Sequence, residues 1–132
     1  MKKLLVALTV LLSGCTVVDA YLMTKYDPNE YQIITGIRAE AGHAKTQCDS
    51  ALTSRYNATK ISYDTQTFVL YSEHIPRNDN LLAAAKALDN IAQGLADQYK
   101  QEKVSPAFCK IKFETIETSA DKLQKVIGGR PR

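Results

Sequence analysis

The sequence contains no tryptophan, only two histidines and three cysteines, and no long apolar run. A membrane-spanning helix needs about 20 consecutive apolar residues, whereas the longest run here extends only from Leu4 to Leu12 and is interrupted by Thr9. A zinc site needs three or four converging ligands. His43 lies near Cys48, but His74 stands alone. We therefore expect neither a spanning helix nor a metal centre.

The motifs of common enzyme classes are also missing. The sequence has no G-x-S-x-G, no H-E-x-x-H and no phosphate-binding glycine loop, and its acidic residues are scattered singly. A catalytic nucleophile needs an adjacent base and an orienting group. His43 and His74 are expected to be surface or half-buried helix residues. The sequence thus predicts a non-catalytic protein without a cofactor or a small-molecule substrate.

The amino terminus does carry a recognisable pattern. Lys2 and Lys3 precede the short apolar run, which ends in Leu12-Ser13-Gly14-Cys15. A charged region followed by a short apolar core is the layout of a secretory signal peptide. The tetrapeptide resembles the lipobox of bacterial lipoproteins; a plain signal peptide with a chance cysteine is the alternative. The resemblance implies that residues 1–14 are removed and that Cys15 carries acyl chains such as palmitate.

Acyl chains on Cys15 would anchor the mature chain stably to a membrane, facing the periplasm. In enteric lipoproteins an aspartate after the cysteine commonly marks inner-membrane retention. Thr16 occupies that position here, so the outer membrane is the expected location.

The charge balance changes once the leader is removed. Loss of Lys2 and Lys3 lowers the count of Lys and Arg from 17 to 15, against 14 Asp and Glu. A nearly neutral chain in the periplasm is not expected to bind nucleic acid. Residues 100–132 hold more basic than acidic residues. A mixed solvated helix face is favoured there over a binding site for anionic lipid or an acidic partner.

The mature chain fits one domain, with a lipidated tether at 15–27, a helical domain at 28–127 and a basic C-terminal tail at 128–132. Asp27, Pro28 and Glu30 form a helix start of the capping-box type. The first helix is predicted from Pro28 to about Tyr56. Its apolar residues follow 3-4-3-4-3 spacing, as on one helix face: Ile34, Ile37, Ala41, Ala44, Cys48 and Ala51.

Two later segments repeat this pattern with 4-3-4-3-4 spacing. One follows the capping residues "RNDN", and its stripe comprises Leu81, Ala85, Leu88, Ala92, Leu95 and Tyr99. The other begins at Ser105 and Pro106 and ends at Gly128-Gly129. Its stripe comprises Cys109, Phe113, Ile116, Ala120, Leu123 and Ile127.

Residues 61–75 allow two interpretations. Ile61, Phe68, Tyr71 and Ile75 fit one helix face, which Pro76 would end. The letters "TFVLY" also have the composition of a strand. A single strand in a helical chain would leave its backbone groups unpaired, so a helix is favoured. The fold class predicted is all-α, a disulfide-linked antiparallel four-helix bundle.

The cysteines provide a test of that bundle. With Cys15 lipidated, Cys48 and Cys109 remain in an oxidising compartment. Both fall on predicted core stripes, of the first and fourth helices, which are neighbours in an up-down-up-down bundle. Helix rise places them within about one turn in height. We therefore predict a disulfide between Cys48 and Cys109.

The lipobox, the compact helices and the cysteines in "HAKTQCD" and "SPAFCK" together resemble the pilotin lipoproteins of type II secretion systems. In those proteins a four-helix bundle holds a short helix of a secretin and escorts it to the outer membrane. The resemblance implies a small helical binding or assembly module with an envelope protein as partner. It assigns no partner-contacting residue, and the ending "GGRPR" is not a feature of pilotins.

Other functions stay open. A phage- or plasmid-encoded envelope lipoprotein acting in superinfection exclusion or lysis is the main alternative, and a structural lipoprotein without a dedicated partner is a third. Tyr21, Tyr26 and Tyr31 lie near the anchor. Such amphipathic rings suit a membrane interface or partner surface, and equally the edge of a bundle.

Overall fold

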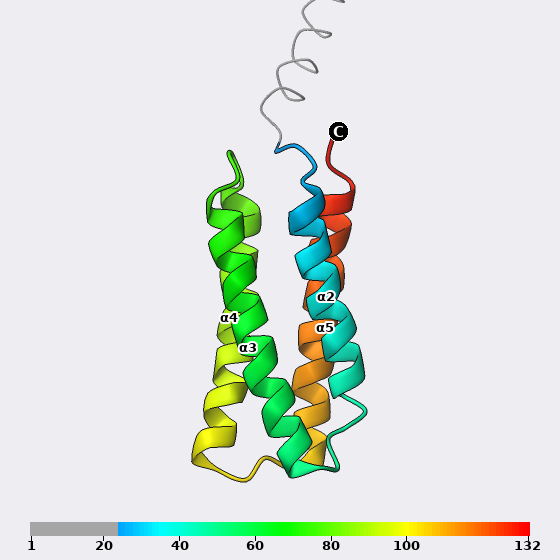
Figure 1. Ribbon diagram of the computed structural model, residues 1–132, viewed down its shortest axis with the longest axis vertical. Coiled ribbons are helices and arrows are strands. Elements are labelled where there is room, and N and C mark those ends of the chain that lie inside the picture. The colour runs from blue at the N-terminus through cyan, green and yellow to red at the C-terminus, as the bar shows by residue number, and fades with distance from the viewer. Residues whose placement is uncertain (1–23) are drawn as a thin grey trace, which may run out of the picture.

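The computed structural model describes residues 24–132. These residues form four helices: α2 (Pro28–Ala44), α3 (Ala51–Glu73), α4 (Asp79–Gln101) and α5 (Pro106–Gly128). The helices run alternately up and down in one bundle (Figure 1). The predicted antiparallel four-helix bundle is confirmed, and the ambiguous segment 61–75 belongs to α3 for most of its length.

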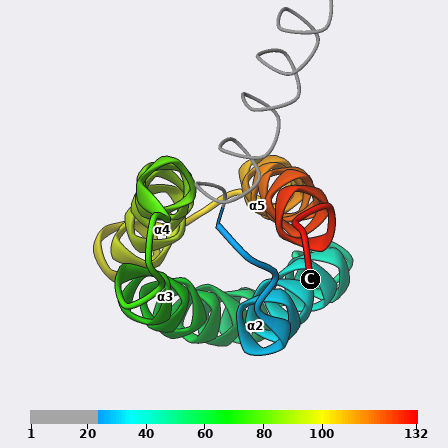
Figure 2. The same cartoon turned by 90° about the horizontal axis from the view of Figure 1, so that it is seen from above.

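Each helix contacts two others, so that α3 lies diagonally opposite α5 (Figure 2). In this view along the helices, the segment that enters α2 crosses the near end of the bundle. The C-terminus lies at the same end (Figure 1). We call this end, where Thr24 to Asp27, the α3–α4 turn and the C-terminal residues meet, the tether end. The opposite end, which carries the α2–α3 and α4–α5 connections, is the distal end.

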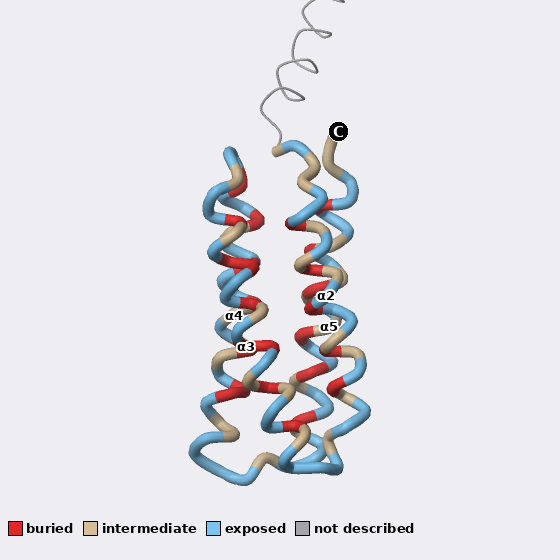
Figure 3. The backbone as a smooth tube through the Cα atoms, in the orientation of Figure 1, coloured by how far each residue is buried: buried red, intermediate tan, exposed pale blue. Residues whose placement is uncertain are grey.

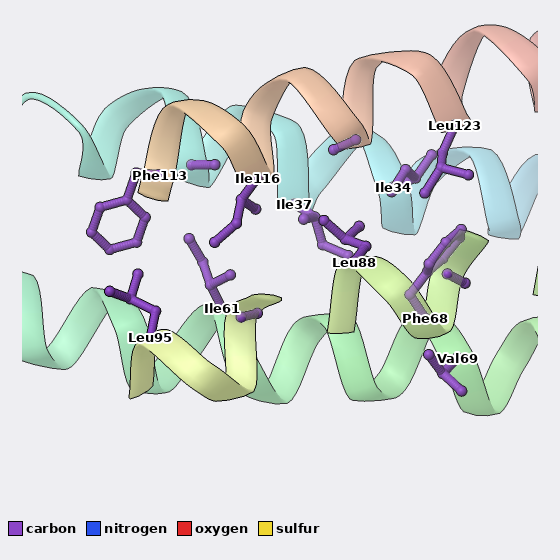
Figure 4. Close-up of a cluster of buried hydrophobic side chains, with 14 of the residues drawn as sticks. Ile34, Ile37, Ile61, Phe68, Val69, Leu88, Leu95, Phe113, Ile116 and Leu123 are labelled. Atoms are coloured by element: carbon purple, nitrogen blue, oxygen red, sulfur yellow. The ribbon is translucent and has the colours of Figure 1, made fainter. Parts of the chain in front are cut away.

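The buried residues line the inner faces of all four helices (Figure 3). Every stripe residue predicted for α5 is buried, as are five of the six predicted for α4. In the centre, Ile61 of α3 and Leu88 of α4 point toward Ile116 of α5 and Ile37 of α2 (Figure 4). A core of aliphatic and aromatic side chains therefore fills the space between the two helix pairs.

The predicted length of the first helix is wrong. Helix α2 ends at Ala44, and a separate helix begins at Ala51. The missed signal is Ser50, whose side chain accepts a hydrogen bond from the backbone N–H of Thr53 and caps α3. Cys48 thus lies in the connection between α2 and α3 rather than on a helix face, and Ala51 is exposed.

The predicted disulfide is nevertheless present. Cys48 is bonded to Cys109, with Cα atoms 5.8 Å apart and a sequence separation of 61. Cys109 is fully buried in the first turn of α5, as its stripe predicted. The bond holds the α2–α3 connection against α5 at the distal end of the bundle.

Candidate functional site

The outer face of α3 carries an unusual concentration of exposed apolar side chains. Within residues 24–132, four of the six large apolar side chains that are exposed belong to this helix. The exposed fractions are 82% for Leu52, 67% for Tyr56, 66% for Tyr63 and 55% for Leu70. Several exposed apolar side chains on one face favour an interaction site, whereas single exposed apolar residues are ordinary.

These four residues lie on one line along the helix. Together with Thr59 and Gln66 they follow 4-3-4-3-4 spacing from residue 52 to residue 70, and none of the six carries a charge. Eighteen residues at 1.5 Å each give a length of roughly 27 Å. We call this set, Leu52, Tyr56, Thr59, Tyr63, Gln66 and Leu70, the α3 stripe.

The core-facing side of α3 is correspondingly polar for a buried surface. Ser54, Ser62, Thr65 and Ser72 are buried there. Their hydroxyls donate to the Ser50 and Thr59 backbone carbonyls, to the Asp89 carboxylate at 2.7 Å and to the Glu30 carboxylate at 2.9 Å. Because each hydroxyl has a partner, the inner face tolerates these groups.

A second feature is a buried polar cluster at the tether end. Glu30 is fully buried on α2, and its carboxylate accepts hydrogen bonds from the Ser72 hydroxyl and the Asn78 amide, both at 2.9 Å. The Arg130 guanidinium donates to the Glu30 carboxylate at 2.5 Å and to the side-chain amide oxygen Oδ1 of Asn78 at 2.6 Å. We call these four residues, Glu30, Ser72, Asn78 and Arg130, the Glu30 cluster.

The Glu30 cluster corrects one detail of the sequence analysis. The N-cap half of the predicted capping box is present, because the Asp27 carboxylate accepts from the Glu30 backbone N–H at 2.8 Å. The Glu30 side chain, however, points into the cluster instead of returning to the cap. The basic tail predicted at 128–132 is likewise partly buried, since the Arg130 side chain is only 7% exposed.

The last residues also hold the segment that leads into α2. The Pro131 carbonyl accepts a hydrogen bond from the Tyr26 N–H at 2.9 Å, and the Arg132 guanidinium lies 4.4 Å from the centre of the Tyr26 ring. The Thr24 hydroxyl donates to the Arg77 carbonyl. The segment before α2 is therefore fixed to the C-terminal residues and to the α3–α4 turn at the tether end, and we call this set of contacts the clasp.

A cleft of about 540 Å³ opens beside this clasp. Its wall consists of the segment before α2, the last turn of α3 and the α3–α4 turn; the lining residues are Lys25, Tyr26, Asp27, Tyr71, His74, Ile75, Pro76 and Arg77. The Tyr71 hydroxyl donates to the Asp27 carboxylate at 3.0 Å. We call this the tether cleft.

The remaining residues singled out from the sequence fall in several places. Cys15, Tyr21 and the leader lie outside the described residues. His43 and His74 are exposed. Tyr31 packs against the core, and its hydroxyl accepts from the Gln124 amide at 3.1 Å. Tyr26 packs on Tyr31 with ring centres 5.8 Å apart, so both belong to the bundle edge.

Two kinds of structural feature are absent from residues 24–132. No helix in this part of the chain has both the length and the apolar character required to cross a bilayer. No group of three or more His, Cys, Asp and Glu residues in the same range is arranged to hold a metal ion. No family model, characterised protein or solved structure matches the chain.

Proposed function

We propose that this chain is a lipid-anchored, non-catalytic envelope protein that faces the periplasm and binds a partner protein through the α3 stripe. The anchor is Cys15, and the membrane expected is the outer membrane. The observation that supports a binding role is the α3 stripe itself, whose six side chains are uncharged and, except for the half-buried Thr59, exposed opposite the core.

The partner element that best fits this surface is an amphipathic helix. A 4-3-4 spacing of side chains on one helix accommodates a second helix lying alongside at a shallow angle. Helix recognition of this kind is also what the pilotin resemblance implies. The binding helix is expected to be about five turns long, because the α3 stripe extends over that length.

Charged residues beside the α3 stripe favour one orientation of the partner helix. Arg55 and Glu73 are exposed on the same flank of the α3 stripe, five turns apart, with Arg55 near the distal end and Glu73 near the tether end. A helix has partial negative charge at its C-terminus and partial positive charge at its N-terminus. The partner helix is therefore expected to run antiparallel to α3, with its C-terminal end beside Arg55.

Site-specific photo-crosslinking in intact cells tests the binding role. A photo-reactive phenylalanine derivative at Tyr63 is expected to give a discrete adduct with a second envelope protein. The matched control is the same group at Ala87, which is exposed on the outer face of α4. Absence of any adduct at residue 63, or the same adducts from both positions, would contradict the proposal.

The adduct also separates the alternatives. A secretion or assembly component supports the pilotin-like role, whereas a phage receptor or an incoming phage protein supports superinfection exclusion. An adduct with a second copy of this chain would mean that the α3 stripe mediates self-association and does not bind a different protein.

The anchor is tested separately. Cys15→Ser is expected to abolish incorporation of labelled palmitate and to leave uncut precursor, because the thiol is the acceptor of the lipid in the lipobox mechanism. Normal processing of the Cys15→Ser chain would remove the lipoprotein assignment without affecting the α3 stripe.

A further inference from the structure

The two cysteines of the disulfide have different surroundings. Cys109 is fully buried in the first turn of α5 and belongs to the hydrophobic core. Cys48 is half-buried and lies outside the helices, in the α2–α3 connection, where its neighbours Gln47 and Asp49 are exposed. The bond thus joins a residue that the core covers completely to one that reaches the surface of the molecule.

This difference decides which sulfur an external thiol can attack. In thiol–disulfide exchange a thiolate attacks one sulfur and expels the other as a thiolate, and the rate depends on access to the sulfur attacked. Attack on Cys109 would come from the side opposite Cys48, where the core is packed. Attack on Cys48 comes from the side opposite Cys109, which leads out of the bundle. Exchange is therefore expected at Cys48, with Cys109 as the leaving group.

The position of Cys109 suits a leaving group that must return. Cys109 is the fourth residue of α5, and the partial positive charge of a helix N-terminus favours a thiolate. Its backbone N–H donates to the Ser105 carbonyl at 3.0 Å, so the helix holds the residue in place without the disulfide. The expelled sulfur therefore stays beside the connection and can attack again.

The α2–α3 connection is also held by contacts other than the disulfide. Before Cys48, the Gln47 N–H donates to the Ala44 carbonyl at 3.0 Å, and the Gln47 side-chain oxygen accepts from the Asn57 amide at 2.8 Å. After Cys48, the Ser50 N–H donates to the Gln47 carbonyl at 3.3 Å, and Ser50 caps α3. Both sides of Cys48 thus keep their place when the bond is open.

We propose that Cys48 is the thiol–disulfide exchange site of this protein, at which a dithiol oxidoreductase makes and breaks the bond to Cys109 in the folded chain. The oxidoreductase contacts the exposed α2–α3 connection at the distal end of the bundle. It forms a mixed disulfide with Cys48 and none with Cys109.

Oxidation of the chain proceeds in two exchange steps. The Cys48 thiolate attacks the disulfide of the oxidoreductase, which forms a bond from Cys48 to one enzyme cysteine and releases the other enzyme cysteine as a thiolate. The Cys109 thiolate then attacks the Cys48 sulfur, which forms the Cys48–Cys109 bond and expels the first enzyme cysteine. The two electrons lost by this chain reduce the enzyme disulfide, and the two protons of its thiols pass to the enzyme thiolates through water. Reduction reverses both steps.

Glutathione is the probe for the native, disulfide-bonded chain. The full chain is incubated with glutathione, free thiols are blocked with N-ethylmaleimide, and tryptic peptides are mapped by mass spectrometry. Trypsin places Cys48 in peptide 46–55 and Cys109 in peptide 104–110, and Cys15 in neither. Glutathione is expected on peptide 46–55 at least about tenfold more often than on peptide 104–110, because a buried sulfur reacts only when the fold opens. Equal labelling, or more on peptide 104–110, would overturn the proposal.

Two matched variants measure the rates separately. Cys109→Ser retains Cys48, Cys48→Ser retains Cys109, and circular dichroism checks that both are folded. With glutathione disulfide, Cys109→Ser is expected to gain glutathione at least about tenfold faster than Cys48→Ser. In about 6 M urea, which exposes both cysteines, the two rates should agree within about twofold. Equal rates in the folded variants would overturn the proposal, and so would a difference that persists in urea.

A trapping experiment tests the oxidoreductase step. A thioredoxin-type protein whose active site is changed from Cys-x-x-Cys to Cys-x-x-Ser cannot resolve a mixed disulfide. Preactivated with a thiol-reactive leaving group, this protein is expected to form a stable adduct with Cys109→Ser, mapped to peptide 46–55, and little adduct with Cys48→Ser. Adducts in equal yield with both folded variants would refute Cys48 as the exchange site.

Discussion

At the scale of single residues, the Glu30 cluster is the most consequential arrangement. A fully buried carboxylate is costly unless it is paired and hydrogen-bonded. Glu30 has three side-chain donors, from Ser72, Asn78 and Arg130. Glu30 lies on α2, and its donors lie at the end of α3, at the N-cap of α4 and just after α5, so one charge joins the ends of all four helices at the tether end.

Removal of the cationic partner should therefore be severe. Arg130→Gln leaves Glu30 buried without its counter-charge and is expected to lower the free energy of unfolding by about 3–5 kcal/mol. Urea denaturation followed by circular dichroism measures the change. Lys122→Gln, at an exposed position of α5, is the control and should stay within about 0.5 kcal/mol of the native chain.

A second variant separates pairing from packing. Glu30→Gln combined with Arg130→Met removes both charges and should be less destabilised than Arg130→Gln alone. Equal losses in the two variants would mean that Arg130 acts through packing and not through its pairing with Glu30.

Another residue-scale effect concerns pH. Burial raises the pKa of Glu40 above its ordinary value of 4.5, and the neighbouring Asp64 raises this pKa further, while Lys60 opposes both. Between the ordinary and the raised pKa the folded chain holds more protons than the unfolded chain. The contribution of Glu40 to stability thus falls as pH rises through that window.

Glu40→Gln cannot ionise, so its stability relative to the native chain is expected to increase from about pH 4 to pH 7. Asp121→Asn provides a control of opposite sign. The hydrogen bond from Lys125 lowers the pKa of Asp121 below 3.8, and Arg38 adds to this. Its contribution is present above that value and lost on further acidification, so Asp121→Asn should lose stability relative to the native chain as pH rises from about pH 2.5 to pH 4. Urea midpoints at about pH 2.5, 4 and 7 measure both trends; trends of the same sign in the two variants would contradict the assignment.

At the scale of elements, the cap residues and stripes were sufficient for α4 and α5. Both α5 boundaries follow from Ser105-Pro106 and Gly128-Gly129, and the Ser105 side chain accepts from the Phe108 N–H. The predicted end of the first helix was wrong because its 3-4 spacing continues by chance through Cys48 and Ala51, past the true end at Ala44. Periodicity alone does not detect a break that preserves its phase.

Helix α3 was ambiguous for a different reason. Its core face includes Ser54, Ser62, Thr65 and Ser72, while Leu52, Tyr56, Tyr63 and Leu70 lie outside. Polar and apolar residues are therefore mixed on both faces, which weakens the pattern on which helix prediction depends. The exposed apolar side chains that obscured the helical pattern of α3 are the same residues that make up the apolar part of the α3 stripe.

The connection between α2 and α3 depends on the disulfide. Reduction, or the double change Cys48→Ser with Cys109→Ser, is expected to cost about 4 kcal/mol, because the bond closes a loop of 61 residues in the unfolded chain. Urea denaturation with and without reductant measures the loss. Reductant should have no further effect on the double variant, and two free thiols in the native chain purified without reductant would refute the bond.

At the scale of the whole molecule, sequence periodicity supplied the architecture and missed the surfaces. Stripe spacing and cysteine parity are local or additive properties, and they led to the correct bundle and disulfide. The Glu30–Arg130 pair joins residues 100 positions apart. No local pattern links them. The tether cleft likewise exists only because the fold brings residues 25–27 against 71–77.

The position of the C-terminal residues beside Thr24 to Asp27 has a practical consequence. An affinity tag or reporter added after Arg132 would emerge beside the segment that leads into α2 and crowd the contacts of Arg130, Pro131 and Tyr26. The α4–α5 connection at the distal end, where Gln101, Glu102 and Lys103 are all exposed, is the better insertion point. Studies that label this protein in cells should place the label there, since a C-terminal fusion could impair folding and be mistaken for loss of function.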